Sequence, residues 1–378
     1  MKKNVKQPHV LLVGGGSGGH VTPVLAVLEV LQIEQQKLQI SWIAPRGDSF
    51  VSQFTNDRVK LHYIFAGKFR RYKGWEWWRY FKNFHVIFKN VLDLFLVIFG
   101  FIQTVGILIR SRPNVCFNKG GFVGLPVGLA CGLLRIPFVL HDSDTVPGIT
   151  NRLIAPFATY ITTGFPISSF RKQQDRVFHV GIPIRAAFFQ ALEHTSDESS
   201  VQIDTKLKPL LFITGGSLGA QRLNQIIVET RSDLAEIFDI VHVVGADNLD
   251  KFQSKPGYKV VPFVTDDYAV YLKKAAIVVV RGGSTSIAEI AVAGSACIVV
   301  PNSFLYDQVE NSKLLEKRNA AIVVDEIAAA DNPSLFVSAV TGLYDDRPRQ
   351  KQLHDSLSKI FPRDASYRIA QLLLPYLV

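Results

Sequence analysis

The chain of 378 residues is poor in cysteine and contains only Cys116, Cys131 and Cys297. These three residues are far apart and stand in apolar stretches, so we expect neither a disulfide framework nor a cysteine-rich metal site. Free cysteine behaves as a small apolar residue, and we expect all three to fill buried positions. A protein of this kind is typical of a reducing compartment.

Long apolar runs are also scarce. Near the N-terminus only the four residues 10–13 are apolar before a glycine cluster begins, which is too short for the core of a signal peptide. We therefore expect a cytoplasmic protein. The stretch 91–109 has the length of a marginal membrane span but contains Asp93, Gln103 and two glycines. We expect a buried or half-buried crossover helix with one side that meets something other than water; a true span is the alternative.

Acidic residues are outnumbered, with 32 Asp and Glu against 42 Lys and Arg, which gives a net charge of +10. This excess favours an anionic partner, such as a nucleic acid, a phosphorylated substrate or an acidic membrane surface. The sequence contains no recognition helix, RNA-binding signature or zinc motif, so we expect no nucleic-acid partner.

The sequence is rich in strand-like runs that alternate with helical patterns, which is typical of βαβ units and parallel sheets. A polar stretch at 194–209 interrupts this alternation, and beyond it the same strand, glycine turn and helix begin again. We expect an α/β fold of two Rossmann-like domains, 1–180 and 181–361, with parallel sheets that face a central cleft, and a last helix at about 362–378 that packs back on the first domain. The expected strands cover residues 10–13, 40–43, 115–117, 138–141, 160–162, 240–244, 259–262, 277–280 and 296–300, with a further strand in "PLLFIT".

The first glycine cluster reads "GGGSGGH", and Gly14, Gly16 and Gly19 fit the dinucleotide fingerprint G-x-G-x-x-G. That fingerprint also needs an acidic residue where the second strand ends, and here the strand ends in "AP". Arg46 could meet the phosphate of NADP, so an NADP-dependent oxidoreductase stays open. His20, in the first helical turn beside an expected anion site, favours a general base instead.

The second half contains "RGGSTSIAEIAVAG", a glycine turn that leads into a helix with three hydroxyl residues in its first turn. Helix-terminal amides and hydroxyls can bind a diphosphate, and Glu289 can accept hydrogen bonds from a ribose diol. The pattern predicts a nucleotide-sugar pocket, with an ordinary amphipathic helix as the alternative. The sequence "HDSD" at 141–144 contains a D-x-D pattern that some glycosyltransferases use for a metal, but three residues are weak evidence and we expect no metal.

The segment "GKFRRYKGWEWWRYFKNFH", residues 67–85, interleaves six basic residues with three of the four tryptophans. Basic residues attract anionic headgroups and tryptophan favours the membrane interface, so we expect this segment to lie on an anionic membrane surface. Aromatic residues packed in an ordinary core behind a basic rim are the alternative.

Seven motifs together resemble the MurG family of peripheral glycosyltransferases in their order along nearly the whole chain. They are "GGGSGGHVTP", "NKGGFVGLP", "HDSDTVPGITNR", "VGIPIR", "ITGGSLGAQRLNQ", "RGGSTSIAEIAVAG" and "DQVENS". The resemblance implies a GT-B fold and an inverting, metal-independent and cofactor-independent transfer of N-acetylglucosamine from UDP-GlcNAc to undecaprenyl-diphospho-MurNAc-pentapeptide, lipid I, which yields lipid II. It also implies a peripheral enzyme on the cytoplasmic face of the cell membrane, beside other cell-wall synthesis proteins. A different sugar or lipid acceptor, as in the galactolipid synthases of similar architecture, is the alternative within the fold.

The same resemblance implies a role for individual residues. His20 would be the base for the MurNAc 4-hydroxyl. Asp144 stands where many members have an asparagine that contacts GlcNAc, and a carboxylate cannot donate the bond that an amide donates. The implied substrate-binding residues are Ser17, Gly18, Gly19, Lys119, Gly120 and Gly121 for the acceptor side, Asp144 and Gln308 for the GlcNAc, Arg185 and Ser217 for the donor diphosphate, Thr285 and Ser286 for the α-phosphate, Val264 and Arg281 for the uracil, Glu289 for the ribose, and Asn151 for a part of the substrate that the resemblance does not specify.

Overall fold

The computed structural model describes residues 7–54, 58–68, 84–166, 170–194, 208–216, 220–264 and 267–377. The chain forms two compact units. The first consists of Met1–Arg185 together with Asp364–Val378, and the second consists of Ala186–Arg363. Each unit is built on its own parallel sheet.

The sheet of the first unit has the strand order β3-β2-β1-β4-β5-β6-β7 within the described residues, and every pairing in it is parallel. The order reverses between β1 and β4, so the loops that follow these two strands lie side by side at the carboxyl edge of the sheet. The strands are β1 (His9–Val13), β2 (Gln39–Pro45), β3 (Val59–Ile64), β4 (Val115–Asn118), β5 (Phe138–Asp142), β6 (Tyr160–Thr163) and β7 (Val177–His179).

Helices cover both faces of this sheet, which explains why β1 is apolar at every central position. Val10 and Leu12 belong to the core under α1, whereas Leu11 and Val13 belong to the core under α5 on the opposite face. The helices of the unit are α1 (Gly18–Glu34), α2 (Ser49–Phe54), α4 (Phe84–Ser111), α5 (Gly121–Leu134), α6 (Ile149–Ile154) and α15 (Ala365–Leu373), with short 3₁₀ turns η1 (Ala155–Phe157), η2 (Arg171–Arg176) and η5 (Leu374–Tyr376).

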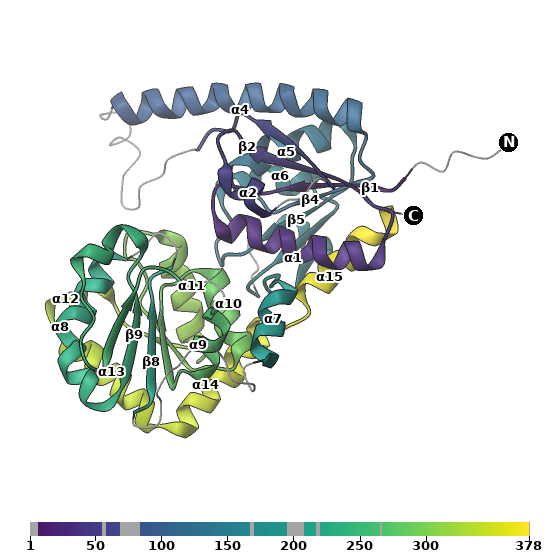
Figure 1. Cartoon of the computed structure of the whole chain (residues 1–378). Helices are drawn as coiled ribbons and strands as arrows, with labels where there is room; N and C mark the ends of the chain where they lie inside the picture. Colours follow the sequence, from purple (N-terminus) through teal and green to yellow (C-terminus); the bar gives the residue numbers. More distant parts are fainter. Residues whose placement is uncertain are drawn as a thin grey trace. The chain divides into compact units, whose positions relative to one another are not determined.

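The C-terminal helix α15 lies beside α1 in the first unit (Figure 1). Ile369 and Leu373 of α15 are fully buried in the same core as Leu28 and Leu31 of α1. The chain therefore begins and ends in one unit, and its last helix completes the core that the first helix opens.

Helix α4 crosses the other face as one long helix (Figure 1) and has two very different sides. Val97 and Leu108 are buried in the core with α5. The outward side exposes a continuous set of large apolar side chains: Phe88, Val91, Leu92, Leu94, Phe95, Ile98, Phe99, Ile102 and Ile109. The expected half-buried crossover helix is confirmed. By length and composition alone, Val91–Ser111 would also suffice to span a bilayer.

The second unit repeats the same strand order, β10-β9-β8-β11-β12-β13 within its described residues, again with parallel pairing. Leu211, Ile213 and Val279 face a core formed with α8 and α13. The strands are β8 (Leu210–Thr214), β9 (Asp239–Val243), β10 (Tyr258–Val261), β11 (Ile277–Val280), β12 (Cys297–Val299) and β13 (Ile322–Val323); the helices are α7 (Ala186–Glu193), α8 (Gln221–Ile237), η4 (Ala246–Lys251), α9 (Tyr268–Lys274), α10 (Ser284–Ala293), α11 (Tyr306–Lys317), α12 (Glu326–Asp331), α13 (Ser334–Asp345) and α14 (Arg347–Ile360).

The strands expected from the sequence are all present, and the α/β class with two Rossmann-like sheets is confirmed. Three edge strands, β3, β7 and β13, were not predicted. β3 and β7 lack a compact apolar run, whereas the short apolar run "AAIVV" that contains β13 was overlooked. The three cysteines are buried and free, as expected. Most of the basic and tryptophan-rich segment 67–85 and most of the polar stretch 194–209 lie outside the described residues.

Candidate functional site

In the first unit, two glycine loops meet at the reversal of strand order. One follows β1 and leads into α1, with Ser17 at the helix N-cap; the other follows β4 and leads into α5. Gly16, Gly120 and Gly121 have φ values of +84°, +80° and +72°, a left-handed backbone that favours glycine. The N-termini of two helices therefore point to one place, which favours an anion.

His20 lies in the first turn of α1 and packs against the second loop. A Cβ atom on Gly121 would stand only 3.1 Å from His20 Cε1, so the imidazole touches the backbone there. Its Nδ1 is buried without a hydrogen-bond partner in the described structure. Desolvation, reinforced by the positive charges of Lys119 and Lys68, lowers the pKa of His20 to about 3. The imidazole is therefore neutral at physiological pH, the form that can accept a proton.

Behind the second loop lies a buried polar cluster that the sequence revealed only in part. Asn151 Nδ2 donates to Asp142 Oδ2 at 2.8 Å, and the Asp144 backbone N–H donates to Asp142 Oδ1 at 3.2 Å. Lys119 is buried close enough to Asp142 and Asp144 for their charges to oppose the lowering of its pKa by desolvation. Asp142 was not predicted as a site residue. Burial, followed by the charge of Asp144, raises its pKa to about 6.

An acidic residue does reach the first glycine loop, although β2 ends in alanine and proline. Asp48 Oδ2 accepts from the Gly16 N–H at 2.7 Å, and its Oδ1 accepts from the Phe50 N–H at 2.8 Å. Asp48 was not predicted as a site residue, because it stands three positions beyond the end of β2. Asp48 fixes the glycine loop and leaves the Gly16 amide engaged within the chain.

Arg185, expected at the donor diphosphate, ends the first unit and pairs with Glu29 of α1. The distance between Arg185 Nε and Glu29 Oε1 is 2.9 Å, and both side chains are partly exposed. The pair is not part of the cluster around His20 described above. In this structure the guanidinium is therefore engaged with a carboxylate of the first unit.

In the second unit, the loop after β11 leads into α10, whose first turn carries the partly exposed Thr285 and Ser286. One turn further on, desolvation raises the pKa of Glu289 to about 8, and a hydrogen bond with Tyr268 opposes this rise. The Tyr268 hydroxyl also bonds with Ser286. Its ring is held edge-on to Phe212 at 5.9 Å. Tyr268 was not predicted as a site residue. It forms hydrogen bonds with two residues that were, Ser286 and Glu289.

Arg281 precedes this loop, and its side chain is committed to a buried ion pair. Arg281 Nη2 lies 2.6 Å from Glu326 Oε1, and Arg281 Nη1 donates to the Val300 carbonyl at 3.1 Å. Removal of one partner from a buried pair of this kind typically costs about 3–5 kcal/mol, because the other charge stays buried. The guanidinium therefore supports the loop. Glu326 lies 45 residues further along the chain, and no local pattern connects the two.

Three further predicted residues have different settings. Gln308 of α11 accepts a hydrogen bond on Oε1 from the Asn302 N–H at 3.0 Å. Helix α11 also lies close to the loop after β11, where a Cβ on Gly282 would stand 2.6 Å from the Gln308 carbonyl oxygen. Val264 follows β10 and is partly exposed. Ser217 lies outside the described residues. The second unit thus gathers Gln308, Thr285, Ser286 and Glu289 around the start of α10.

Family models match both units of the chain. The glycosyltransferase family 28 N-terminal domain matches residues 10–163, and the glycosyltransferase family 28 C-terminal domain matches residues 210–369. The chain belongs to glycosyltransferase family 28. It is therefore a glycosyltransferase, and family membership does not favour the NADP-dependent oxidoreductase that the first glycine loop left open.

Family 28 relatives match along nearly the full chain. A protein of Treponema pallidum is 32% identical over 97% of this chain and 95% of its own length, and one of Clostridium novyi is 32% identical over 91% of both. Both are named UDP-N-acetylglucosamine--N-acetylmuramyl-(pentapeptide) pyrophosphoryl-undecaprenol N-acetylglucosamine transferase. Among solved structures, MurG of Acinetobacter baumannii has a TM-score of 0.73 at 22% identity and covers 97% of this chain and 99% of its own. A UDP-GlcNAc 2-epimerase of Neisseria meningitidis bound to UDP-GlcNAc has a TM-score of 0.64 at 12% identity over 97% of this chain and all of its own, which shows a shared fold.

Proposed function

We propose that this glycosyltransferase moves N-acetylglucosamine from UDP-GlcNAc to the MurNAc 4-hydroxyl of undecaprenyl-diphospho-MurNAc-pentapeptide. The observation that carries the proposal is the 32% identity, over 97% of the chain, to a relative named for this reaction. The histidine beside the two glycine loops and the hydroxyl-rich start of α10 supply the chemistry that such a reaction needs.

The two units divide the work in this proposal. The first unit, Met1–Arg185 with Asp364–Val378, binds the acceptor, and its glycine loops and Lys119 face the acceptor diphosphate. The second unit binds UDP-GlcNAc, with Thr285 and Ser286 at the α-phosphate and Glu289 at the ribose. Backbone amides at the start of α10 are fixed in place before reaction, so they stabilise the charge of departing UDP without reorganisation.

His20 is the general base in this scheme. The MurNAc oxygen attacks C1 of GlcNAc, the bond from C1 to the UDP oxygen breaks with inversion, and the hydroxyl proton passes to the imidazole. An imidazole with a pKa near 3 is a weak base. Desolvation is the main cause of this low pKa, and the charges of Lys119 and Lys68 add to it. An anionic diphosphate beside the two lysines offsets their part, so the acceptor itself makes His20 more basic.

A transfer assay tests the proposed function. Radiolabelled UDP-GlcNAc and a lipid I analogue should give a β-linked GlcNAc-MurNAc product, and UDP-galactose should give none. Diacylglycerol serves as a competing acceptor, because a glycolipid synthase of the same fold would prefer it. Transfer to diacylglycerol, or none to the lipid I analogue, would contradict the proposal.

The outward side of α4 is the proposed contact with the anionic inner surface of the cell membrane. Its exposed apolar residues, among them Phe95 and Phe99, form a surface far more apolar than a helix in water usually presents. An acceptor anchored by undecaprenol lies in that bilayer. The excess of positive charge in the chain adds attraction to anionic headgroups.

We expect the double variant Phe95→Asp, Phe99→Asp to lose at least tenfold in affinity for phosphatidylglycerol-containing vesicles, because it places two charges on the apolar face. Ile33→Asp, on the exposed part of α1, is the matched control and should bind as the wild type does. Sedimentation with vesicles measures the binding. Equal binding of all three proteins would remove α4 from the membrane contact, and equal binding to neutral and anionic vesicles would remove the electrostatic part.

A further inference from the structure

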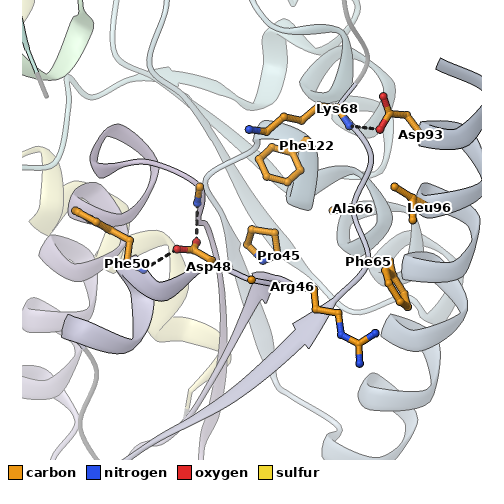
Figure 2. A pocket seen from close by; sticks show the side chains of 12 residues that line it. Pro45, Arg46, Asp48, Phe50, Phe65, Ala66, Lys68, Asp93, Leu96 and Phe122 are labelled. Carbon is orange, nitrogen blue, oxygen red and sulfur yellow. Dashed lines mark hydrogen bonds between the residues drawn. The ribbon is translucent and has the colours of Figure 1, made fainter. Parts of the chain in front are cut away.

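A hollow lies in the first unit between the first glycine loop and α4 (Figure 2). It has a volume of about 860 Å³. Its walls come from five places in the chain: Gly16 of the glycine loop, the turn after β2 with Arg46, the segment after β3 with Phe65 and Lys68, Leu96 of α4 and Phe122 of α5. None of these side chains except Lys68 has entered the mechanism above.

Close backbone packing builds this hollow. Gly67 lies against the Asp93 backbone of α4, and Gly100 of α4 lies against the carbonyl of Phe65, so closely that neither position has room for a side chain. The segment after β3 is therefore held tightly along α4. As a result Phe65 and Lys68 have defined places on the wall.

The charged groups of the hollow are of two kinds (Figure 2). Asp48 accepts from the Gly16 and Phe50 amides, and Asp93 Oδ1 accepts from the Lys68 N–H at 3.2 Å, so both carboxylates are bonded to backbone. The Arg46 guanidinium lies over the Phe65 ring and the Lys68 ammonium over the Phe122 ring, each 4.7 Å from the ring centre. No carboxylate in the described part of the chain forms an ion pair with Arg46 or Lys68. As far as the described residues show, both cations can bind an anion.

The two ends of the hollow differ in character. At one end Lys68 lies close enough to His20 for its charge to act on the imidazole, so this end adjoins the proposed acceptor site. At the other end the wall is α4, where Leu96 faces the hollow and its neighbours Phe95 and Phe99 are exposed. The hollow therefore has His20 near one end and α4, whose outward side is apolar, as one wall.

We propose that this hollow binds the lipid end of the acceptor: Lys68 holds the phosphate next to the prenyl chain, and Phe65, Phe122 and Leu96 pack on the first isoprene units. This inference rests on the proposed function, because it assumes a polyprenyl diphosphate acceptor. A chain that leaves the hollow across α4 passes directly onto the surface proposed to contact the bilayer. The hollow thus aligns the acceptor so that its sugar lies toward His20.

Binding of geranyl diphosphate to the full chain tests the inference without turnover. Burial of two isoprene units should make it bind at least tenfold more tightly than inorganic diphosphate, as measured by titration calorimetry. Lys68→Ala should weaken both ligands, whereas Phe122→Ala, which also removes the ring beneath Lys68, should weaken geranyl diphosphate more than diphosphate. Phe157→Ala, at an exposed ring of the same unit outside the hollow, is the control and should change neither.

Equal affinity for the two diphosphates, or the same loss of both in Phe122→Ala, would overturn the prenyl assignment. If MurNAc-pentapeptide without a diphosphate displaces geranyl diphosphate, the hollow binds the peptide part of the acceptor, and the prenyl assignment is also overturned. Failure of the proposed function is a separate result, namely no sugar transfer by the wild type to any lipid I analogue. Lower turnover of Phe122→Ala on prenylated acceptors alone would support the inference.

Discussion

Replacement of His20 by alanine should lower turnover by about 10²–10⁴-fold, the usual contribution of a general base. The affinity for UDP-GlcNAc should stay within about twofold of the wild type, because the proposed donor site lies in the other unit. Turnover is measured with a lipid I analogue at saturating donor, and affinity by calorimetry. His62→Ala, on β3 of the same unit, is the matched control.

The pH dependence of the reaction is a second test of the role of His20. A group whose pKa is about 3 in the free enzyme is unprotonated throughout the range from pH 5 to 8, so His20 should give no acid limb in kcat/KM for the acceptor. The pH profile of kcat reports the enzyme–substrate complex, and its acid limb should lie at a pH above the pKa of about 3 in the free enzyme, because the bound anion raises the pKa of His20. Near-normal turnover of His20→Ala would remove the general-base role, and an acid limb near pH 6.5 in kcat/KM would show that the free imidazole titrates normally.

Replacement of Glu289 by alanine should weaken UDP-GlcNAc binding by roughly 10- to 100-fold, since a hydrogen bond to a charged group contributes about 1.5–3 kcal/mol. Turnover at saturating donor should change much less. Glu310→Ala, at an exposed pair with Lys313 on α11, is the control and should bind the donor normally. An unchanged dissociation constant for Glu289→Ala would contradict the ribose assignment.

The raised pKa of Glu289 also predicts a proton release. Below pH 8 the free carboxyl is largely protonated, whereas ribose hydroxyls that donate to it favour the carboxylate. Donor affinity should therefore rise with pH up to about 8, by at most tenfold per pH unit, and then level off. Calorimetry in buffers of different ionisation enthalpy counts the released proton. Glu289→Gln should show neither the release nor the rise; a pH dependence retained in this variant would assign the titration to another group.

Much of the fold followed from local patterns. The β1 and β11 units were predicted because a buried apolar strand, a glycine turn and a helix of period 3.6 all occur within about 25 residues. The strand β3 was missed because "VKLHYI" has no continuous apolar run; its apolar and polar residues alternate, which is itself typical of a half-buried strand. The role of β3 is visible only in the tertiary structure, because the segment that follows it carries Phe65 and Lys68 and packs against α4.

The candidate site was predicted as a set of residue types, but not as a set of interactions. Arg185 and Arg281 were both expected at the nucleotide, and both side chains instead have carboxylate partners, Glu29 and Glu326, that are distant in sequence. Asp48 was missed because it lies in the turn beyond β2, and no local pattern shows that this turn bonds to the first glycine loop. An ion pair depends on which elements pack together, and the identity of a basic residue does not reveal whether its charge is already balanced.

By itself the sequence determined the strand, glycine turn and helix units, the two glycine loops with His20 beside one of them, and the family to which the chain belongs, because these depend on residues close together in the chain. Only the tertiary structure decided which charges are paired, how strongly His20 and Glu289 are desolvated, and that the apolar side of α4 points outward. These properties arise from burial, and burial is set by contacts between distant segments.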